Sequence, residues 1–394
     1  MVRKVNLFVM AMMMPISALG IEITDYVDPE SFYEEARVDA TFNLKSGNQD
    51  QTSFNGNASG FYEVNYSTLP FTWSIDLEGN LDLDRGSADE DSTEKGYDFL
   101  TSGNFDKYFN NTSDLLGYGS LELGYRRPFG ADEDDDPYVK LGAGVGYGRV
   151  INATPLAKVL RFIEELMDYQ VITREPDEQT YLTMASIVSR EDEFESRYGH
   201  EDYKQYWIGE LEKVMQKAGL LKNNTIGAVG VIKMHDVLID EPISVRKHGW
   251  IAKGGIGYVA SNYDGSDSDP SLDASFEYAL PIGHKFQFIE LAKYSTILAS
   301  DTVHNLTNRM SGTYEVSDRI DWVNFWDLNV TLPTEDDAKD IITNALESSF
   351  RYHLTNRFDA VLSVKLTQVE DDVDDNGNDD LDTAVNMGVS YRLK

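Results

Sequence analysis

Apolar and polar residues alternate with a period of two over long stretches of the chain, and this pattern restricts the possible folds more than any other feature. The clearest stretch runs from Phe71 to Asp84. Its apolar members occupy odd positions, namely Phe71, Trp73, Ile75, Leu77, Leu81 and Leu83. Strands of soluble sheets average about five or six residues, whereas strands of outer-membrane barrels run for about ten residues with one apolar and one polar face. The pattern therefore predicts membrane-spanning strands, and a periplasmic or secreted β-sandwich is the alternative.

Similar stretches recur along the chain and predict about fourteen strands, an even number that is typical of bacterial outer-membrane barrels. The expected strands begin near residues 33, 54, 70, 95, 115, 137, 248, 271, 284, 307, 319, 342, 357 and 382. We therefore predict an all-β membrane barrel of about 14 antiparallel strands, closed in the outer membrane of a Gram-negative bacterium.

The N-terminal segment has the three-part pattern of a secretory signal peptide. Arg3 and Lys4 precede an apolar run from Val5 to Met14, and small residues follow at 18–20. This run is shorter than the about 20 apolar residues that a membrane-spanning helix needs. The expected organisation is a signal peptide over 1–20, strands one to six over 21–151, a helical insertion over 152–247 and strands seven to fourteen over 248–394.

The connections between the predicted strands alternate in length. The long connections follow the odd-numbered strands and cover residues 47–53, 85–94, 128–136, 262–270, 297–306, 333–340 and 370–382. Barrels of this kind keep short turns on the periplasmic side and longer loops outside. The connection 152–247 follows the sixth predicted strand and so lies on the side of the short turns, although it is itself long. This insertion is therefore expected to be periplasmic.

Within the insertion the period changes to that of an α-helix. A first helix is predicted from Leu156 to Met167, with Thr154 as its N-cap and Pro155 at its first position. A second helix is predicted over 178–190, and a third from Tyr203 to a stop at Gly219. Residues 225–245 fit either a helix or a strand.

Tyr203, Tyr206 and Trp207 lie together on the third predicted helix. Aromatic clusters occur at interfaces and in cores alike, so these residues plug the lumen, contact a partner or pack inside the insertion. The strands that flank the insertion carry inward glycines, which fit either barrel curvature or close approach by such a plug. These glycines are Gly142, Gly144, Gly146, Gly148, Gly255 and Gly257.

Composition excludes several classes of function. Lys and Arg number 34 against 68 Asp and Glu, a net charge of −34 that repels nucleic acids. The absence of cysteine excludes disulfides and thiol chemistry. The sequence contains neither the HExxH nor the GxSxG pattern, so we expect no enzyme, and His353 is the only candidate for a general base.

Acidic residues gather in the long connections. Asp372, Asp374 and Asn376 match positions one, three and five of an EF-hand loop, but Thr383 stands where that loop has its bidentate Glu. The segment is therefore a solvated acidic loop or a weak Ca²⁺ or Mg²⁺ site, and no other cofactor is expected.

The inward strand positions mix both signs of charge with an acidic surplus, which favours cations over anions. The lumen-facing candidates are Asp39, Glu63, Asp76, Glu78, Asp82, Arg351, Lys365 and Arg392. These residues predict a porin-like passive channel. The alternative is a structural or assembly barrel whose helical insertion binds a periplasmic or envelope protein. Outer-membrane lipid and lipopolysaccharide are the other expected partners.

The segment from Phe42 to Phe54, FNLKSGNQDQTSF, resembles the first hairpin of the salt-induced outer-membrane β-barrel family. The resemblance covers the first two or three strands. It implies a barrel and no particular activity, and the helical insertion departs from the family pattern.

Overall fold

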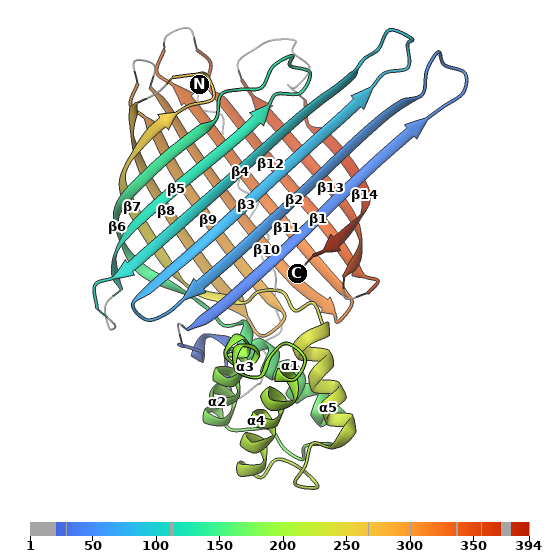
Figure 1. Ribbon diagram of the computed structural model, residues 1–394, viewed down its shortest axis with the longest axis vertical. Coiled ribbons are helices and arrows are strands. Elements are labelled where there is room, and N and C mark those ends of the chain that lie inside the picture. Colours follow the sequence, from blue (N-terminus) through green and yellow to red (C-terminus); the bar gives the residue numbers. More distant parts are fainter. Residues whose placement is uncertain are drawn as a thin grey trace.

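The fold is a closed antiparallel barrel of fourteen strands, in which each strand pairs with its neighbours in sequence and β1 pairs with β14 (Figure 1). The computed structural model describes residues 21–28, 30–110, 114–266, 268–299, 302–335, 338–355, 357–371 and 380–393. The strands are β1 (Ser31–Lys45), β2 (Ser53–Ser67), β3 (Phe71–Arg85), β4 (Thr93–Tyr108), β5 (Leu115–Arg127), β6 (Tyr138–Asn152), β7 (Lys247–Ser261), β8 (Asp269–Ile282), β9 (Phe286–Ile297), β10 (Val303–Ser317), β11 (Ile320–Pro333), β12 (Ile341–His353), β13 (Phe358–Glu370) and β14 (Asp382–Arg392). The predicted strand count and order are confirmed.

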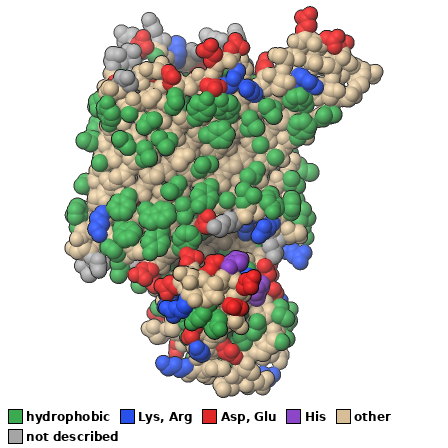
Figure 2. All heavy atoms as spheres, viewed as in Figure 1, with side chains coloured by type: hydrophobic (Ala, Val, Ile, Leu, Met, Phe, Trp, Pro, Cys, Tyr) green, Lys and Arg blue, Asp and Glu red, His purple; other side chains and the backbone are tan. Residues whose placement is uncertain are grey.

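The alternation of the sequence places apolar side chains on the outside of the barrel. Ile75 and Leu77 of β3 are each 41% exposed, whereas Asp76 between them is only partly exposed on the inner face. Figure 2 shows hydrophobic side chains over the wall of the barrel, with acidic and basic side chains gathered at its rims. Apolar side chains on the outside and polar side chains on the inside leave a large apolar surface that no part of the protein covers, and soluble domains avoid such surfaces.

The two ends of the barrel differ as the connection lengths predicted. At one end lie the short turns and the insertion between β6 and β7, and we call it the helical end. The opposite end, which we call the loop end, carries the longer connections. The strands begin within four residues of the predicted points, the largest difference being β10, which begins at Val303 rather than near 307.

The insertion folds into a helical subdomain that lies outside the barrel at the helical end (Figure 1). It contains α1 (Thr154–Asp168), α2 (Glu178–Val188), α3 (Glu191–Tyr198), α4 (Tyr203–Lys217), α5 (Gly227–His235) and the π-helical turn η2 (Asp236–Asp240). Its core is apolar and includes the fully buried Phe162, Trp207 and Met215. None of the helices in the described part of the chain is long and apolar enough to cross a membrane.

Three details of the subdomain differ from the sequence prediction. The second predicted helix corresponds to α2, and α3 follows it as a helix that was not predicted. Thr154 is the first residue of α1, and Ala153 takes the N-cap position. The Thr154 hydroxyl instead bonds the Asn152 side chain at 2.6 Å and accepts the Arg246 backbone N–H at 3.0 Å, and so joins the two ends of the insertion.

The described chain begins with a short segment that packs on the helices rather than in the barrel. Ile21, Ile23 and Tyr26 are buried in the core of the helical subdomain. Burial raises the pKa of the Tyr26 phenol to about 12. The Tyr26 carbonyl lies 2.6 Å from Nε2 of His248 on β7. Residues 21–28, which the sequence analysis grouped with the first strands, therefore belong structurally to the helical subdomain.

Candidate functional site

The candidate site is the polar interior of the barrel. The sequence-predicted lumen residues lie on the inward-facing positions of six strands, and they fall into two groups by exposure. Glu78, Asp82 and Lys365 are exposed and so face solvent within the barrel. The others are only partly exposed, namely Asp39, Glu63, Asp76, Arg351 and Arg392.

Several ion pairs join strands that are not neighbours in the sheet, so they run through the interior of the barrel. Lys247 of β7 lies 3.6 Å from Glu63 of β2. Lys253 of β7 lies 2.7 Å from Asp106 of β4. The interior is therefore crossed by charged side chains rather than lined by them alone.

The helical end of the interior holds a buried charge network. Nδ1 of His353 lies 2.7 Å from Asp359, and Nε2 lies 3.1 Å from Asp321. Arg37 of β1 reaches the same Asp359 at 3.5 Å. All four side chains are less than a tenth exposed. Each ring nitrogen of His353 therefore contacts a carboxylate, an arrangement that suits a structural role in which the ring joins β11, β12 and β13.

Residues 241–246, the linker between η2 and β7, add to this network. Arg246 is fully buried, and its guanidinium donates to Glu315 at 2.6 Å, to the His284 carbonyl at 3.1 Å and to the Ser244 carbonyl at 2.8 Å. The Ser244 hydroxyl donates to Asp321 at 3.4 Å. The linker is thereby fixed to β10, to β11 and to the turn before β9.

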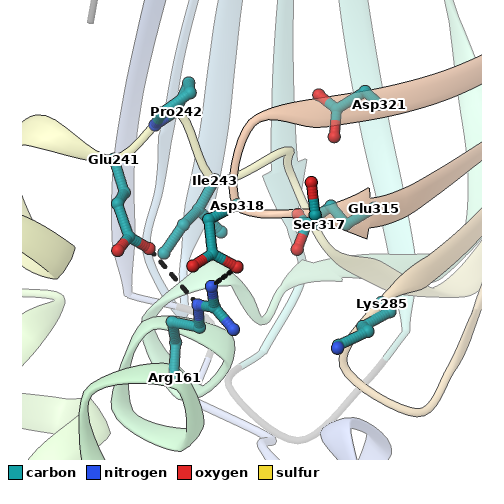
Figure 3. A pocket seen from close by; sticks show the side chains of 9 residues that line it. All are labelled: Arg161, Glu241, Pro242, Ile243, Lys285, Glu315, Ser317, Asp318 and Asp321. Atoms are coloured by element: carbon teal, nitrogen blue, oxygen red, sulfur yellow. Dashed lines mark hydrogen bonds and ion pairs between the residues drawn. The ribbon is translucent and has the colours of Figure 1, made fainter. Parts of the chain in front are cut away.

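A cavity of about 20 Å³, room for about one water molecule, lies between the linker, α1 and the β10–β11 turn (Figure 3). Arg161 points into it from α1 and bonds Glu241 of the linker at 3.3 Å and Asp318 of the turn. Burial raises the pKa of the Glu241 carboxyl, and the Arg161 guanidinium offsets that shift only in part. This ion-pair cluster attaches the helical subdomain to the barrel.

The inward glycines lie close to the adjacent strands, and at two of them the ring of Tyr118 also approaches. A Cβ atom at Gly144 would lie 2.6 Å from the Tyr118 ring, and one at Gly255 would lie 2.5 Å from the Tyr118 hydroxyl. The ring of Tyr118 on β5 therefore lies over β6 and β7. Because the helices lie outside the barrel (Figure 1), the sequence-based idea that they plug the lumen is wrong for this structure.

The aromatic residues of α4 separate into core and surface. Tyr203 and Trp207 are buried, and the Trp207 indole N–H donates to the Ile187 carbonyl at 2.8 Å. Tyr206 is 46% exposed and stacks on Tyr198 with the ring centroids 4.0 Å apart. Of the three residues predicted to contact a plug site or a partner, only Tyr206 is available to a partner.

The structure also contains a group of metal-binding residue types that the sequence analysis missed. The donor atoms of His235, Asp236 and Asp240 lie within 4.8 Å of one another. The π-helical turn produces this proximity, and no pattern in the ambiguous segment 225–245 had indicated it. The sequence-predicted metal residues Asp372, Asp374 and Asn376 lie outside the described residues.

No protein-family model matches the chain, and no curated protein is similar to it in sequence. Among solved structures it is similar to the Acinetobacter baumannii outer membrane protein Omp33, at 8% identity over 93% of this chain and 99% of that one, with a TM-score of 0.30. It is also similar to a BenF-like porin from Pseudomonas fluorescens Pf-5, at 8% identity over 93% and 98%, with a TM-score of 0.32. For CdiB from Escherichia coli the identity is 7% over 91% and 63%, with a TM-score of 0.38. These values are too low to support a functional argument, so the barrel assignment rests on the strand pairing.

Proposed function

We propose that the chain is an outer-membrane β-barrel that forms a narrow, passive, cation-preferring channel with its helical subdomain in the periplasm. The observation that carries the proposal is the closed barrel with an apolar outer wall and a charged interior. In a bilayer every backbone polar group must be satisfied within the protein, and closed barrels meet this condition. The strands contain 11 to 16 residues, enough for the about 9–11 residues that a tilted membrane strand needs.

The orientation follows from the two unlike ends. Outer-membrane barrels carry short turns on the periplasmic side and long loops outside. This rule puts the helical end in the periplasm and the acidic loops at the cell surface. The N-terminal signal-peptide pattern fits the export that this location requires. The apolar wall would then contact membrane lipid, and the outer rim would contact lipopolysaccharide.

The cation preference is argued from the exposed lumen charges. Glu78 and Asp82 face solvent inside the barrel, and the whole chain carries a net charge of −34. Carboxylates along a pore attract cations and repel anions. We infer that the buried charge network at the helical end narrows the path, and we therefore expect a small unitary conductance.

The test is the reversal potential of the purified protein in a planar bilayer under a salt gradient. The unmodified protein should show a reversal potential of cation-selective sign. The double substitution E78Q/D82N should move that potential toward zero. The variant E210Q is the control, because Glu210 lies on the surface of the helical subdomain and pairs only with Lys213 among the interactions described. Equal potentials in all three proteins would contradict the assignment of these lumen carboxylates.

A second function, anchoring a periplasmic partner, is favoured by the exposed apolar surface of the subdomain. Val229 and Ile232 of α5 are 50% and 58% exposed, and Tyr206 adds a half-exposed ring on α4. Bilayer recordings separate the two functions. Persistent absence of conductance, together with envelope proteins that co-purify with the wild type and are lost with Y206A or I232S, would favour the anchor over the channel.

A further inference from the structure

The barrel is closed by an unusually short seam. β1 and β14 pair through only four residue pairs, which run from Arg37 opposite Arg392 to Ala40 opposite Val389. Among the described residues every other neighbouring pair of strands has ten or more such pairs, and β1 pairs with β2 through fifteen. The seam is therefore the weakest line in the wall.

Above these four pairs the ladder between the two strands ends, although a Cβ at Gly388 would still lie 3.4 Å from the Thr41 side chain. Thr41–Lys45 of β1 pair with β2 alone, and Asp382–Gly388 of β14 pair with β13 alone. The outward side chains at this point are exposed: Phe42 is 62% exposed, and Met387 is 79% exposed. Figure 1 shows the tips of the β1–β2 and β3–β4 hairpins projecting together at one side of the rim.

A free strand edge presents unpaired N–H and C=O groups at alternate residues. In water these groups bind solvent, but in the hydrocarbon of a bilayer each costs several kcal/mol. If the barrel is embedded in the membrane, as proposed above, these edges must therefore find a partner there.

The sequence supplies that partner within the same chain. Continuing the register from Ala40 opposite Val389 adds five pairs in which apolar residues meet outside and mostly polar or small residues meet inside. These pairs are Thr41–Gly388, Phe42–Met387, Asn43–Asn386, Leu44–Val385 and Lys45–Ala384. No pair in this extended register opposes two like charges or buries a charge on the lipid side.

We propose that the β1–β14 seam is a lateral gate, which closes fully in the membrane through these five added pairs and which in this structure is partly open, joined by four pairs. Opening exposes the polar lumen wall directly to the bilayer. A molecule that passed there would need both a polar and an apolar part, so the gate suits an amphipath rather than a simple ion. The proposal rests on membrane insertion of the barrel and adds a route that an ordinary axial pore does not need.

Disulfide trapping tests the closed state, and the absence of native cysteine means that introduced thiols have no competitors. The pair N43C/N386C spans the proposed closure, and A40C/V389C spans an existing pair. The pair N43C/V385C is the matched control, because its two side chains point to opposite faces and cannot meet the disulfide geometry. Under an oxidant in native membranes, the first two pairs should crosslink and the third should not.

Electron–electron distance measurement on spin labels at 43 and 386, in lipid vesicles, then tests for two states. A short and a long population together support the gate. A single short population would mean a permanently closed seam, and a single long one would mean that the edges stay apart or hold a strand of another chain. Either single population overturns the proposal. A different result would refute the closed membrane barrel itself. In that case A40C/V389C fails to crosslink, and unboiled gels lack the fast-migrating band of the folded barrel.

Discussion

Replacement of Trp207 by alanine should destabilise the helical subdomain while the barrel stays folded. Trp207 is fully buried in the subdomain core and donates its indole N–H to the Ile187 carbonyl. A buried aromatic side chain removes about 150–250 Å² from water, which at about 25 cal/mol per Å² corresponds to an upper limit of about 4–6 kcal/mol. Measured truncations of buried Phe and Trp cost about 3–5 kcal/mol. We therefore expect W207A to lower the free energy of unfolding of the subdomain by about 4 kcal/mol.

The assay is a urea titration of the full-length protein in detergent, followed by the helical band of circular dichroism. Unboiled gels should show the same fast-migrating barrel form for variant and wild type, because the subdomain core is separate from the barrel wall. Y206A on the same helix is the matched control. Tyr206 is half-exposed, and its stacking on Tyr198 is worth about 0.5–1.5 kcal/mol. Equal losses in W207A and Y206A, or loss of the barrel form in W207A, would refute the division into two packed units.

Three further predictions concern the insertion, its second helix and the barrel wall. Deletion of 154–245 with a short turn in its place should leave a folded barrel of larger conductance, because the linker that holds Arg246 against Glu315 is removed. An unchanged conductance would mean that the constriction lies in the barrel wall. D177A should lower the urea midpoint of the subdomain at neutral pH, because the Asp177 carboxylate caps α2 by accepting the Thr180 N–H at 2.8 Å. The hydrogen bonds from Thr180 also lower the pKa of this carboxyl below its ordinary value of 3.8. A lowered carboxyl pKa adds stability above the ordinary value that is lost as pH falls through the folded value, so variant and wild type should converge in acid, and a constant difference at all pH values would argue against the charge-dependent part of the cap. G144A should reduce the yield of the fast-migrating form, because the added Cβ would lie 2.3 Å from the Gly254 carbonyl oxygen. The control G103A should fold normally, because no atom lies within 4 Å of a Cβ placed there. Equal yields of the two variants would contradict the packing of β6 against β7.

Most of the barrel could be predicted from the sequence because a strand with two unlike faces is recorded directly in alternate residues. Ile75 and Asp76 differ in solvent preference whatever their distant neighbours are, so the inward and outward faces follow from local pattern alone. The strand order followed from the short turns, since antiparallel neighbours need only a few residues between them. The length of the β1–β14 seam could not be predicted, because it depends on how residues at opposite ends of the chain align.

The site was predicted in part. The inward positions of Glu78 and Lys365 followed from alternation, but the pairing of Lys247 with Glu63 did not, since it joins strands β7 and β2 through the interior. The inward glycines were associated with either barrel curvature or close approach by a plug, whereas the groups closest to them belong to adjacent strands, with the Tyr118 ring near Gly144 and Gly255. The packing of Ile21, Ile23 and Tyr26 on the helices was missed because three residues are too few to show a period.

Surface labelling of single-cysteine variants on intact cells tests the central claim, a barrel that spans the outer membrane with its helices in the periplasm. E90C lies in the β3–β4 connection at the loop end, and Q205C lies at an exposed position of α4. With a membrane-impermeant maleimide, the account predicts labelling of E90C on intact cells and labelling of Q205C only after the outer membrane is permeabilised. Labelling of Q205C on intact cells with protection of E90C would invert the orientation, and immediate labelling of both would contradict membrane-spanning placement.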